Sequence, residues 1–121
     1  MSMHAAQAET LTCPKCGGAM RVQRFPENDA YRCEGCRGLW LPLMANEQLE
    51  ERAAEIDTDR YTGGSAPEPR TLACPECEFM PLIRMVDAAR PDIHFESCKR
   101  CYGRYYDAGE FRDVSEDPSF L

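Results

Sequence analysis

The chain has 121 residues, eight cysteines and a formal net charge of −7 at pH 7. This acidity repels polyphosphates from the molecule as a whole, so nucleic-acid binding would need a local basic patch. No stretch reaches the roughly 20 apolar residues of a membrane span, and the start of the chain lacks the basic segment and apolar run of a secretory signal. We therefore expect a cytoplasmic protein with no membrane contact.

The first ordered unit is predicted over residues 11–57, after a polar end, residues 1–10, that we expect to be flexible. Alternating apolar and polar residues predict antiparallel strands over 19–25 and 30–33. Leu39-Trp40-Leu41 then predicts a short third strand.

A helix is predicted over about residues 44–57, because Leu49, Ala53 and Ile56 recur at helical spacing. Asn46 is the expected N-cap. The apolar stripe is narrow, so we expect this helix to pack against Trp40 or against the second unit.

Residues 58–72 contain a cluster of glycine, serine and proline that predicts a linker, so no fixed placement of the two units is implied. The second unit, residues 73–114, repeats the first with four extra residues, which we place in its hairpin. Its predicted strands cover 81–86 and 92–97, followed by Tyr105-Tyr106 at the position of Trp40-Leu41. Asp107 and Glu110 have the spacing of a capping box for a last helix, and residues 115–121 form a flexible end.

The cysteines carry the strongest chemical signal, because they form four Cys-x-x-Cys pairs with none left over. Sixteen residues separate the first two pairs and twenty separate the last two, as in zinc ribbons. A reducing compartment favours metal binding or redox chemistry over disulfides for such pairs. The pattern predicts two sites, each with four thiolate ligands: Cys13, Cys16, Cys33 and Cys36 in the first, and Cys74, Cys77, Cys98 and Cys101 in the second.

Zinc is the favoured ion, with two ions per chain, although sulfur ligands alone do not exclude iron in a rubredoxin-like site. Four protein ligands close the coordination shell, so we expect structural rather than catalytic sites and no enzyme. The alternative is a thiol oxidoreductase, since Cys-Pro-x-Cys also resembles a redox loop. Each pair here is matched by another pair downstream and no α/β pattern surrounds it, which favours metal.

Several other residues have a functional and a structural interpretation. Trp40, Tyr105 and Tyr106 could stack on bases or anchor a peptide, but we prefer a role in a minimal core. His94 is interpreted as a strand residue and His4 as a solvent-facing side chain. The basic residues are interleaved with acidic ones, so we interpret them as mixed surface charge rather than a nucleic-acid face: Arg21, Arg24, Arg32, Arg37, Lys99, Arg100 and Arg104.

At Cys13-Pro14-Lys15-Cys16-Gly17-Gly18 and Cys33-Glu34-Gly35-Cys36-Arg37-Gly38-Leu39-Trp40-Leu41 the chain resembles the transcription factor IIB-type zinc ribbon family of small bacterial proteins. The second unit resembles the family's later part, from Gly103 through Phe111. The resemblance implies two tandem zinc ribbons with the eight cysteines as ligands, and it does not imply a transcription role.

The expected fold is therefore a small metal-stabilised α+β chain of two tandem zinc ribbons, each with two to three antiparallel strands and a short C-terminal helix. The leading functional hypothesis is a non-enzymatic adaptor that binds another protein. Binding to nucleic acid or to the transcription machinery is the alternative. The second site departs from the family pattern, with Glu78 in place of a glycine, and is expected to be the weaker one.

Overall fold

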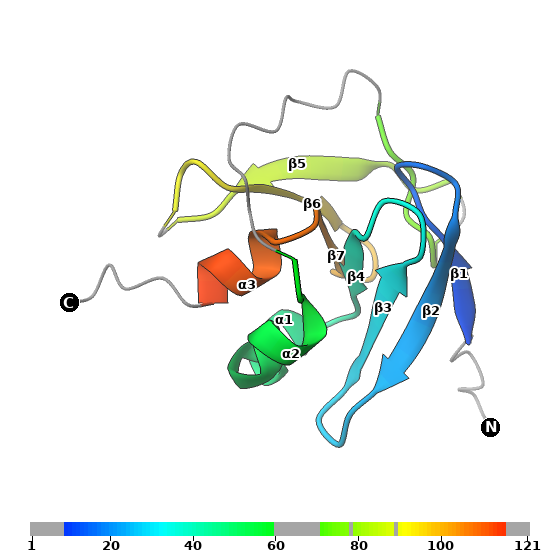
Figure 1. Cartoon of the computed structure of the whole chain (residues 1–121). Coiled ribbons are helices and arrows are strands. Elements are labelled where there is room, and N and C mark those ends of the chain that lie inside the picture. Colours follow the sequence, from blue (N-terminus) through cyan, green and yellow to red (C-terminus); the bar gives the residue numbers. More distant parts are fainter. Residues whose placement is uncertain (1–8, 60–70, 78, 89, 116–121) are drawn as a thin grey trace.

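The computed structural model describes residues 9–59, 71–77, 79–88 and 90–115, and it contains one twisted antiparallel sheet with short helices (Figure 1). The seven strands follow the order β1-β2-β3-β4-β7-β6-β5. The predicted fold class is confirmed, since each unit forms a hairpin with a third strand and a short helical segment. None of the helices in the described ranges is long and apolar enough to cross a membrane.

The first ribbon contains β1 (Thr10–Thr12), β2 (Ala19–Arg24), β3 (Asp29–Cys33) and β4 (Leu39–Leu41). The two hairpin strands and the short third strand were predicted within a residue of these bounds. The edge strand β1 was not, because three residues are too few to show a period. It forms because Leu11 lies opposite Met20 and packs against the buried cluster that contains it.

The second ribbon contains β5 (Leu82–Val86), β6 (His94–Cys98) and β7 (Arg104–Tyr106). Leu82 pairs with Cys98 as Met20 pairs with Cys33, which fixes the correspondence between the two ribbons. Leu82 follows Cys74 by one residue more than Met20 follows Cys13. Only three of the four extra residues therefore lie in the hairpin, and the fourth lies in the first cysteine turn.

The two ribbons form one sheet because β4 pairs with β7. Trp40 lies opposite Tyr105, and the flanking pairs are Leu39 with Tyr106 and Leu41 with Arg104. This register places an approximate twofold axis at the Trp40–Tyr105 pair, since each strand occupies the same position in its own ribbon. The linker expected over residues 58–72 did not imply this fixed arrangement, and residues 60–70 lie outside the described part of the chain.

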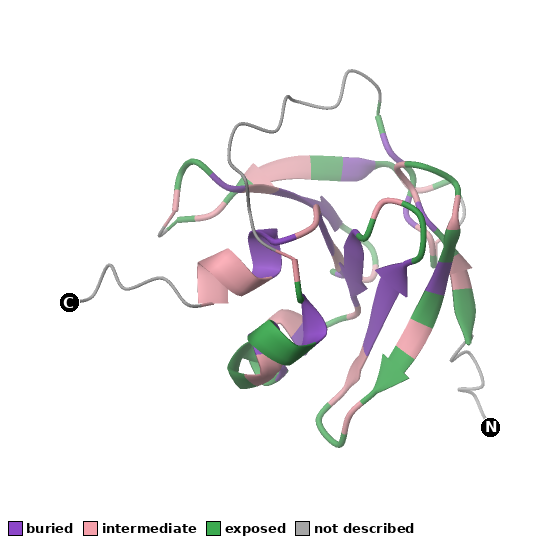
Figure 2. Cartoon of the chain, viewed as in Figure 1, coloured by how far each residue is buried: buried purple, intermediate pink, exposed green. Residues whose placement is uncertain are grey.

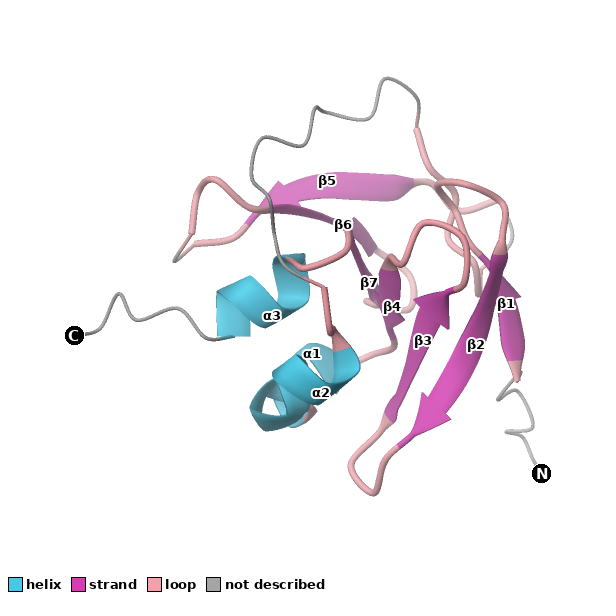
Figure 3. Cartoon of the chain, viewed as in Figure 1, coloured by secondary structure: helices cyan, strands magenta, loops and turns pink. Residues whose placement is uncertain are grey.

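The predicted first helix is split into α1 (Ala45–Gln48), a 3₁₀ turn η2 (Glu50–Arg52) and α2 (Ala53–Ile56). Asn46 is not its N-cap: α1 begins after Met44, which has a left-handed backbone and no capping side chain. The predicted apolar stripe is buried. The last helix, α3 (Glu110–Ser115), was predicted, and it lies beside α2 (Figure 3).

Strand alternation divides the buried residues between the two faces of the sheet. Leu39, Leu41 and Tyr106 pack with the helices, whereas Trp40 and Tyr105 pack with the cysteines. The first helical segments therefore pack against the second ribbon's Tyr106 and Phe111 and not against Trp40. Figure 2 shows that burial is greatest where the ribbons meet. Both cysteine groups consequently belong to the face opposite the helices.

Candidate metal centres

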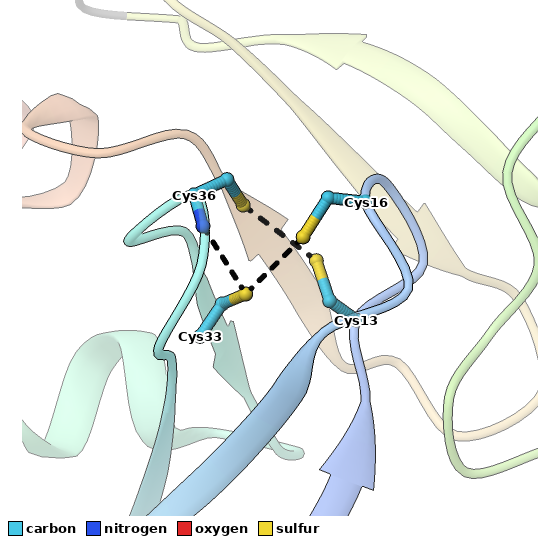
Figure 4. A group of neighbouring side chains, drawn as sticks. All are labelled: Cys13, Cys16, Cys33 and Cys36. Atoms are coloured by element: carbon cyan, nitrogen blue, oxygen red, sulfur yellow. Dashed lines mark hydrogen bonds between the residues drawn. The ribbon is translucent and has the colours of Figure 1, made fainter.

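The first cysteine group is assembled from two turns, as predicted (Figure 4). Cys13 and Cys16 come from the turn between β1 and β2, and Cys33 and Cys36 come from the end of β3 and the turn that follows. All four Sγ atoms lie within 4.8 Å of one another. Cys13 Sγ is 3.7 Å from Cys36 Sγ, and Cys16 Sγ is 3.4 Å from Cys33 Sγ.

The second group repeats this arrangement with Cys74, Cys77, Cys98 and Cys101. Its Sγ atoms also lie within 4.8 Å of one another, and those of Cys74 and Cys101 are 3.7 Å apart. The structure thus brings together all eight cysteines that the sequence analysis selected.

Both groups suit zinc. A tetrahedral ion with Zn–S bonds of about 2.3 Å separates its sulfur ligands by about 3.8 Å, close to the separations found here. None of the eight cysteines forms a disulfide bond in this structure. The groups contain only sulfur donors, and such a set is typical of structural zinc and also of iron.

Backbone amides point at the sulfurs and would partly offset the charge of four thiolates. The amides of Gly35 and Cys36 donate to Cys33 Sγ over 3.3 and 3.4 Å. In the second group Arg100 and Cys101 donate in the same way to Cys98 Sγ, over 3.3 and 3.4 Å. These hydrogen bonds are formed within the tight turn of each Cys-x-x-Cys pair.

The thiols of each group shift one another's pKa values. The hydrogen bond with Cys13 lowers the pKa of the Cys36 thiol to about 4, with help from Tyr105, and raises the pKa of Cys13. Burial opposes ionisation of Cys98, yet the amides of Cys101 and Arg100 bring its pKa to about 7. Each group therefore contains a sulfur that ionises readily, which favours a cationic ligand.

Each cysteine group also contacts an aromatic residue of the other ribbon. The hydroxyl of Tyr105, from the second ribbon, lies 3.4 Å from Cys36 Sγ and 3.9 Å from Cys13 Sγ in the first group. Trp40, from the first ribbon, donates its Nε1–H to Glu76 in the second cysteine turn over 2.6 Å. Both rings are buried, as predicted, but their contacts with the opposite ribbon were not predicted.

Two glycines leave space for the aromatic rings that Trp40 and Tyr105 place against the opposite ribbon. A Cβ on Gly38 would lie 2.6 Å from Tyr105 Cζ, and one on Gly103 would lie 2.9 Å from Trp40 Cε2. The two glycines occupy equivalent positions, five residues after Cys33 and Cys98. Glycine is required at both positions because an aromatic ring of the opposite ribbon occupies the space that a side chain would need.

The predicted capping box at α3 is half correct. Glu110 accepts the Asp107 amide over 3.0 Å, as a capping box requires. The Asp107 side chain instead forms an ion pair with Lys15 in the first cysteine turn, over 2.7 Å. The carboxylate of Asp57, from the first ribbon, accepts the amides of Gly109 and Arg112.

The basic residues of the first hairpin are paired, which agrees with their interpretation as mixed charge. Arg21 pairs with Glu34, Arg24 pairs with Asp29 over 3.2 Å, and Arg37 pairs with Asp59 over 3.0 Å. Arg32 is buried and pairs with Asp57 over 3.7 Å. Arg104 lies over the Phe95 ring, while Lys99 and Arg100 are exposed. His94 is a half-buried residue of β6, and His4 lies outside the described residues.

Comparison with known proteins agrees with the first site. The model of the transcription factor zinc-finger family matches residues 12–52, which contain the first four cysteines, β2 to β4 and α1. No curated protein and no solved structure matches the chain. The first ribbon is therefore similar to this zinc-finger family. The second cysteine group is supported by its geometry alone, because the family match ends before it.

Proposed function

We propose that this chain is a non-catalytic zinc-binding adaptor with two structural zinc ions, which binds an extended segment of a protein partner along β5. Zinc binding is supported by the two groups of four sulfurs and by the family match. The absence of an open coordination position in such a group is what supports a structural role rather than an enzyme.

The main support for a partner at β5 is a difference in side chains between β5 and the equivalent strand β2. The register places Ile83 of β5 where β2 has Arg21, and Val86 where β2 has Arg24. The arginines form surface ion pairs, whereas Ile83 and Val86 are 41% and 52% exposed. The same backbone positions are thus charged on one ribbon and apolar on the other.

The edge of β5 supports an extended partner. β5 is the last strand in the order of the sheet. At its start Leu82 donates its amide to Leu72 over 2.8 Å and Ala73 bridges Pro81, whereas over Ile83–Val86 the only pairing in the described part of the chain is with β6. An unpaired edge offers main-chain hydrogen bonds to an added strand, and neighbouring apolar side chains offer contacts for specificity.

Phe79 adds an anchor three residues before the start of β5. It is 95% exposed and has a φ of 62°, an unfavourable backbone conformation for a bulky residue. Such a phenylalanine contributes no burial within the chain, which favours a contact with another molecule. The partner should be neutral or basic, because four thiolates and one divalent ion per site change the net charge from −7 to −11.

The test compares the two ribbons within the full chain. A photo-crosslinking amino acid is placed at Val86 and, as the matched control, at Arg24, and captured proteins are identified by mass spectrometry. A partner captured only from Val86 is purified and its affinity is measured against Ile83→Arg/Val86→Arg. This variant installs the residues that the first ribbon already carries, so it should fold and retain zinc.

We expect the double variant to bind the purified partner at least about tenfold more weakly, which is a loss of about 1.4 kcal/mol. The reciprocal control, Arg21→Ile/Arg24→Val, should bind as the natural chain does. Equal binding by the Ile83→Arg/Val86→Arg variant, or equal capture from both positions, would reject β5 as the binding edge.

A second candidate, binding to nucleic acid, is favoured by the match to a transcription factor zinc-finger family and by the exposed Lys99 and Arg100. Titration with single- and double-stranded DNA and RNA at low salt tests it. Binding that weakens with salt and with Lys99→Ala/Arg100→Ala would support this candidate, and binding insensitive to salt would remove it.

A further inference from the structure

We propose that Tyr105 is a positioning residue of the first cysteine group, and that the zinc affinity of the first ribbon depends through it on the folding of the second. The inference rests on the proposed zinc binding. It goes beyond the adaptor role because it concerns how the two sites fill.

The geometry gives Tyr105 a direct contact with the sulfurs. Its hydroxyl is 3.4 Å from Cys36 Sγ, and its ring is buried in the cluster that contains Cys13 and Cys33. Thiolates bound to zinc can only accept hydrogen bonds, so the tyrosine hydroxyl must be the donor. An outer hydrogen bond of this kind stabilises the charge of the ligand and holds it in place.

The position of Tyr105 is set by the second ribbon. It belongs to β7, which pairs with β6, the strand that ends at the ligand Cys98. Loss of the second site would free the segment that holds β7, and the hydroxyl would leave the first group. Trp40 makes the reciprocal connection, since it donates to Glu76 between Cys74 and Cys77.

A connection of this kind is reciprocal in its energetics. If a filled second site raises the affinity of the first, a filled first site raises the affinity of the second by the same factor. Chains with one zinc should therefore be scarcer than independent sites would give. The approximate twofold axis at Trp40 and Tyr105 places these two connections in one region of the sheet.

The experiment measures metal affinity in the full chain. Reduced, metal-free protein is titrated with cobalt, whose thiolate charge-transfer absorption reports four-sulfur coordination, and with zinc in competition with a chromogenic chelator. Tyr105→Phe removes only the hydroxyl. Tyr106→Phe is the matched control, because Tyr106 is a buried neighbour whose hydroxyl accepts a hydrogen bond from Arg104 on the other face of the sheet.

We expect Tyr105→Phe to lower the affinity of the first site by about 10- to 100-fold, the usual effect of losing an outer hydrogen bond, and Tyr106→Phe to leave it unchanged. Cys74→Ser/Cys77→Ser should also weaken the first site, but less so in the Tyr105→Phe background. Native mass spectrometry at one zinc per chain should show fewer one-zinc chains than independent sites predict.

Unchanged first-site affinity in Tyr105→Phe would overturn the inference. So would an equal effect of Cys74→Ser/Cys77→Ser in both tyrosine backgrounds, because the connection would then pass elsewhere. These outcomes are distinct from failure of the proposed function, in which the natural chain itself would bind neither metal with four-sulfur coordination.

Discussion

At the scale of single residues, the structure explains why two positions near the cysteines must be glycine. Gly38 and Gly103 each face an aromatic ring of the opposite ribbon, and both rings are fully buried. A packed core does not admit an added methyl group without shifts in neighbouring backbone. The two glycines are therefore part of the contact between ribbons and not only of the cysteine turns.

Gly38→Ala and Gly103→Ala should each lower the free energy of unfolding by about 3 kcal/mol, because the new Cβ would overlap a ring that cannot move away. Gly17→Ala is the control: Gly17 has a φ of 81° but open space around it, so only backbone strain of about 1 kcal/mol should appear. Guanidinium unfolding in excess zinc measures all three. A similar loss in the three variants would show that backbone conformation, not the ring contact, selects these glycines.

Glu110 predicts a dependence of stability on pH. Burial, followed by the nearby Asp107, raises the pKa of its carboxyl from 4.5 to about 7. Below pH 4.5 the Glu110 carboxyl is neutral in both the folded and the unfolded chain. Above pH 4.5 it ionises in the unfolded chain but stays largely neutral in the folded chain until about pH 7. The stability that Glu110 contributes is therefore fully present at low pH and is lost as the pH rises through about 7.

Glu110→Gln removes this penalty while keeping an oxygen for the Asp107 amide. The variant should gain stability relative to the natural chain as the pH rises from 5.5 to 8, by about 2 kcal/mol. Urea unfolding at both pH values gives the difference, and the pH dependence of zinc binding cancels because both chains share it. A difference that does not change with pH would mean that Glu110 ionises normally in the folded chain.

At the scale of elements, α3 is held by a residue of the other ribbon. Asp57, which follows α2, accepts the amides of Gly109 and Arg112 over 2.9 and 3.1 Å and pairs with the buried Arg32. Burial raises the pKa of Asp57, and the two amides and the arginine oppose that shift. A helix of six residues is too short to be stable alone, so this cap and the apolar contact with Tyr106 fix its position.

Asp57→Ala should lower the free energy of unfolding by about 3–5 kcal/mol, because it removes the acceptor of two amides and the charge partner of a buried arginine. Arg32→Met removes the charge partner, and the double variant should lose less than the sum of the two single variants. Chemical unfolding of the four chains completes this cycle. Additive losses would indicate that Asp57 acts only as a cap for α3.

The elements also show where sequence reasoning succeeded. The eight cysteines, both hairpins and α3 were predicted because their signals are local: fixed spacing, alternation of period two, and a capping glutamate. β1 and the split of the first helix were missed, because three- and four-residue segments show no period. Asn46 failed as a cap since the chain turns at Met44 through a left-handed residue, which no local pattern marks.

At the scale of the whole molecule, the joining of the ribbons was the main feature that the sequence analysis did not predict. One signal was available: Leu39-Trp40-Leu41 is apolar on both faces, as in a central strand with both faces covered. The register with Arg104-Tyr105-Tyr106 could not follow from it, because strands of three residues from different units can pair in several ways. The pairing is decided by the packing of Trp40 and Tyr105 into opposite cysteine groups.

A single sheet predicts a single loss of structure when metal is removed. The cysteines themselves form part of the buried cluster that spans both ribbons, so neither group can open without exposing Trp40 and Tyr105. Structural zinc contributes about 10–16 kcal/mol to the folding of comparable small sites, more than the stability of most small domains. Chelation should therefore unfold both ribbons together.

The measurement follows amide signals of each ribbon by NMR during titration with a chelator, with β2 and β5 as reporters. Signals from both strands should decay in parallel, and Cys74→Ser/Cys77→Ser should weaken the first ribbon as well. Two separate transitions would mean that the β4–β7 pairing contributes little stability. Each ribbon would then be an independent unit, because its own four sulfurs, and not the shared sheet, would hold it folded.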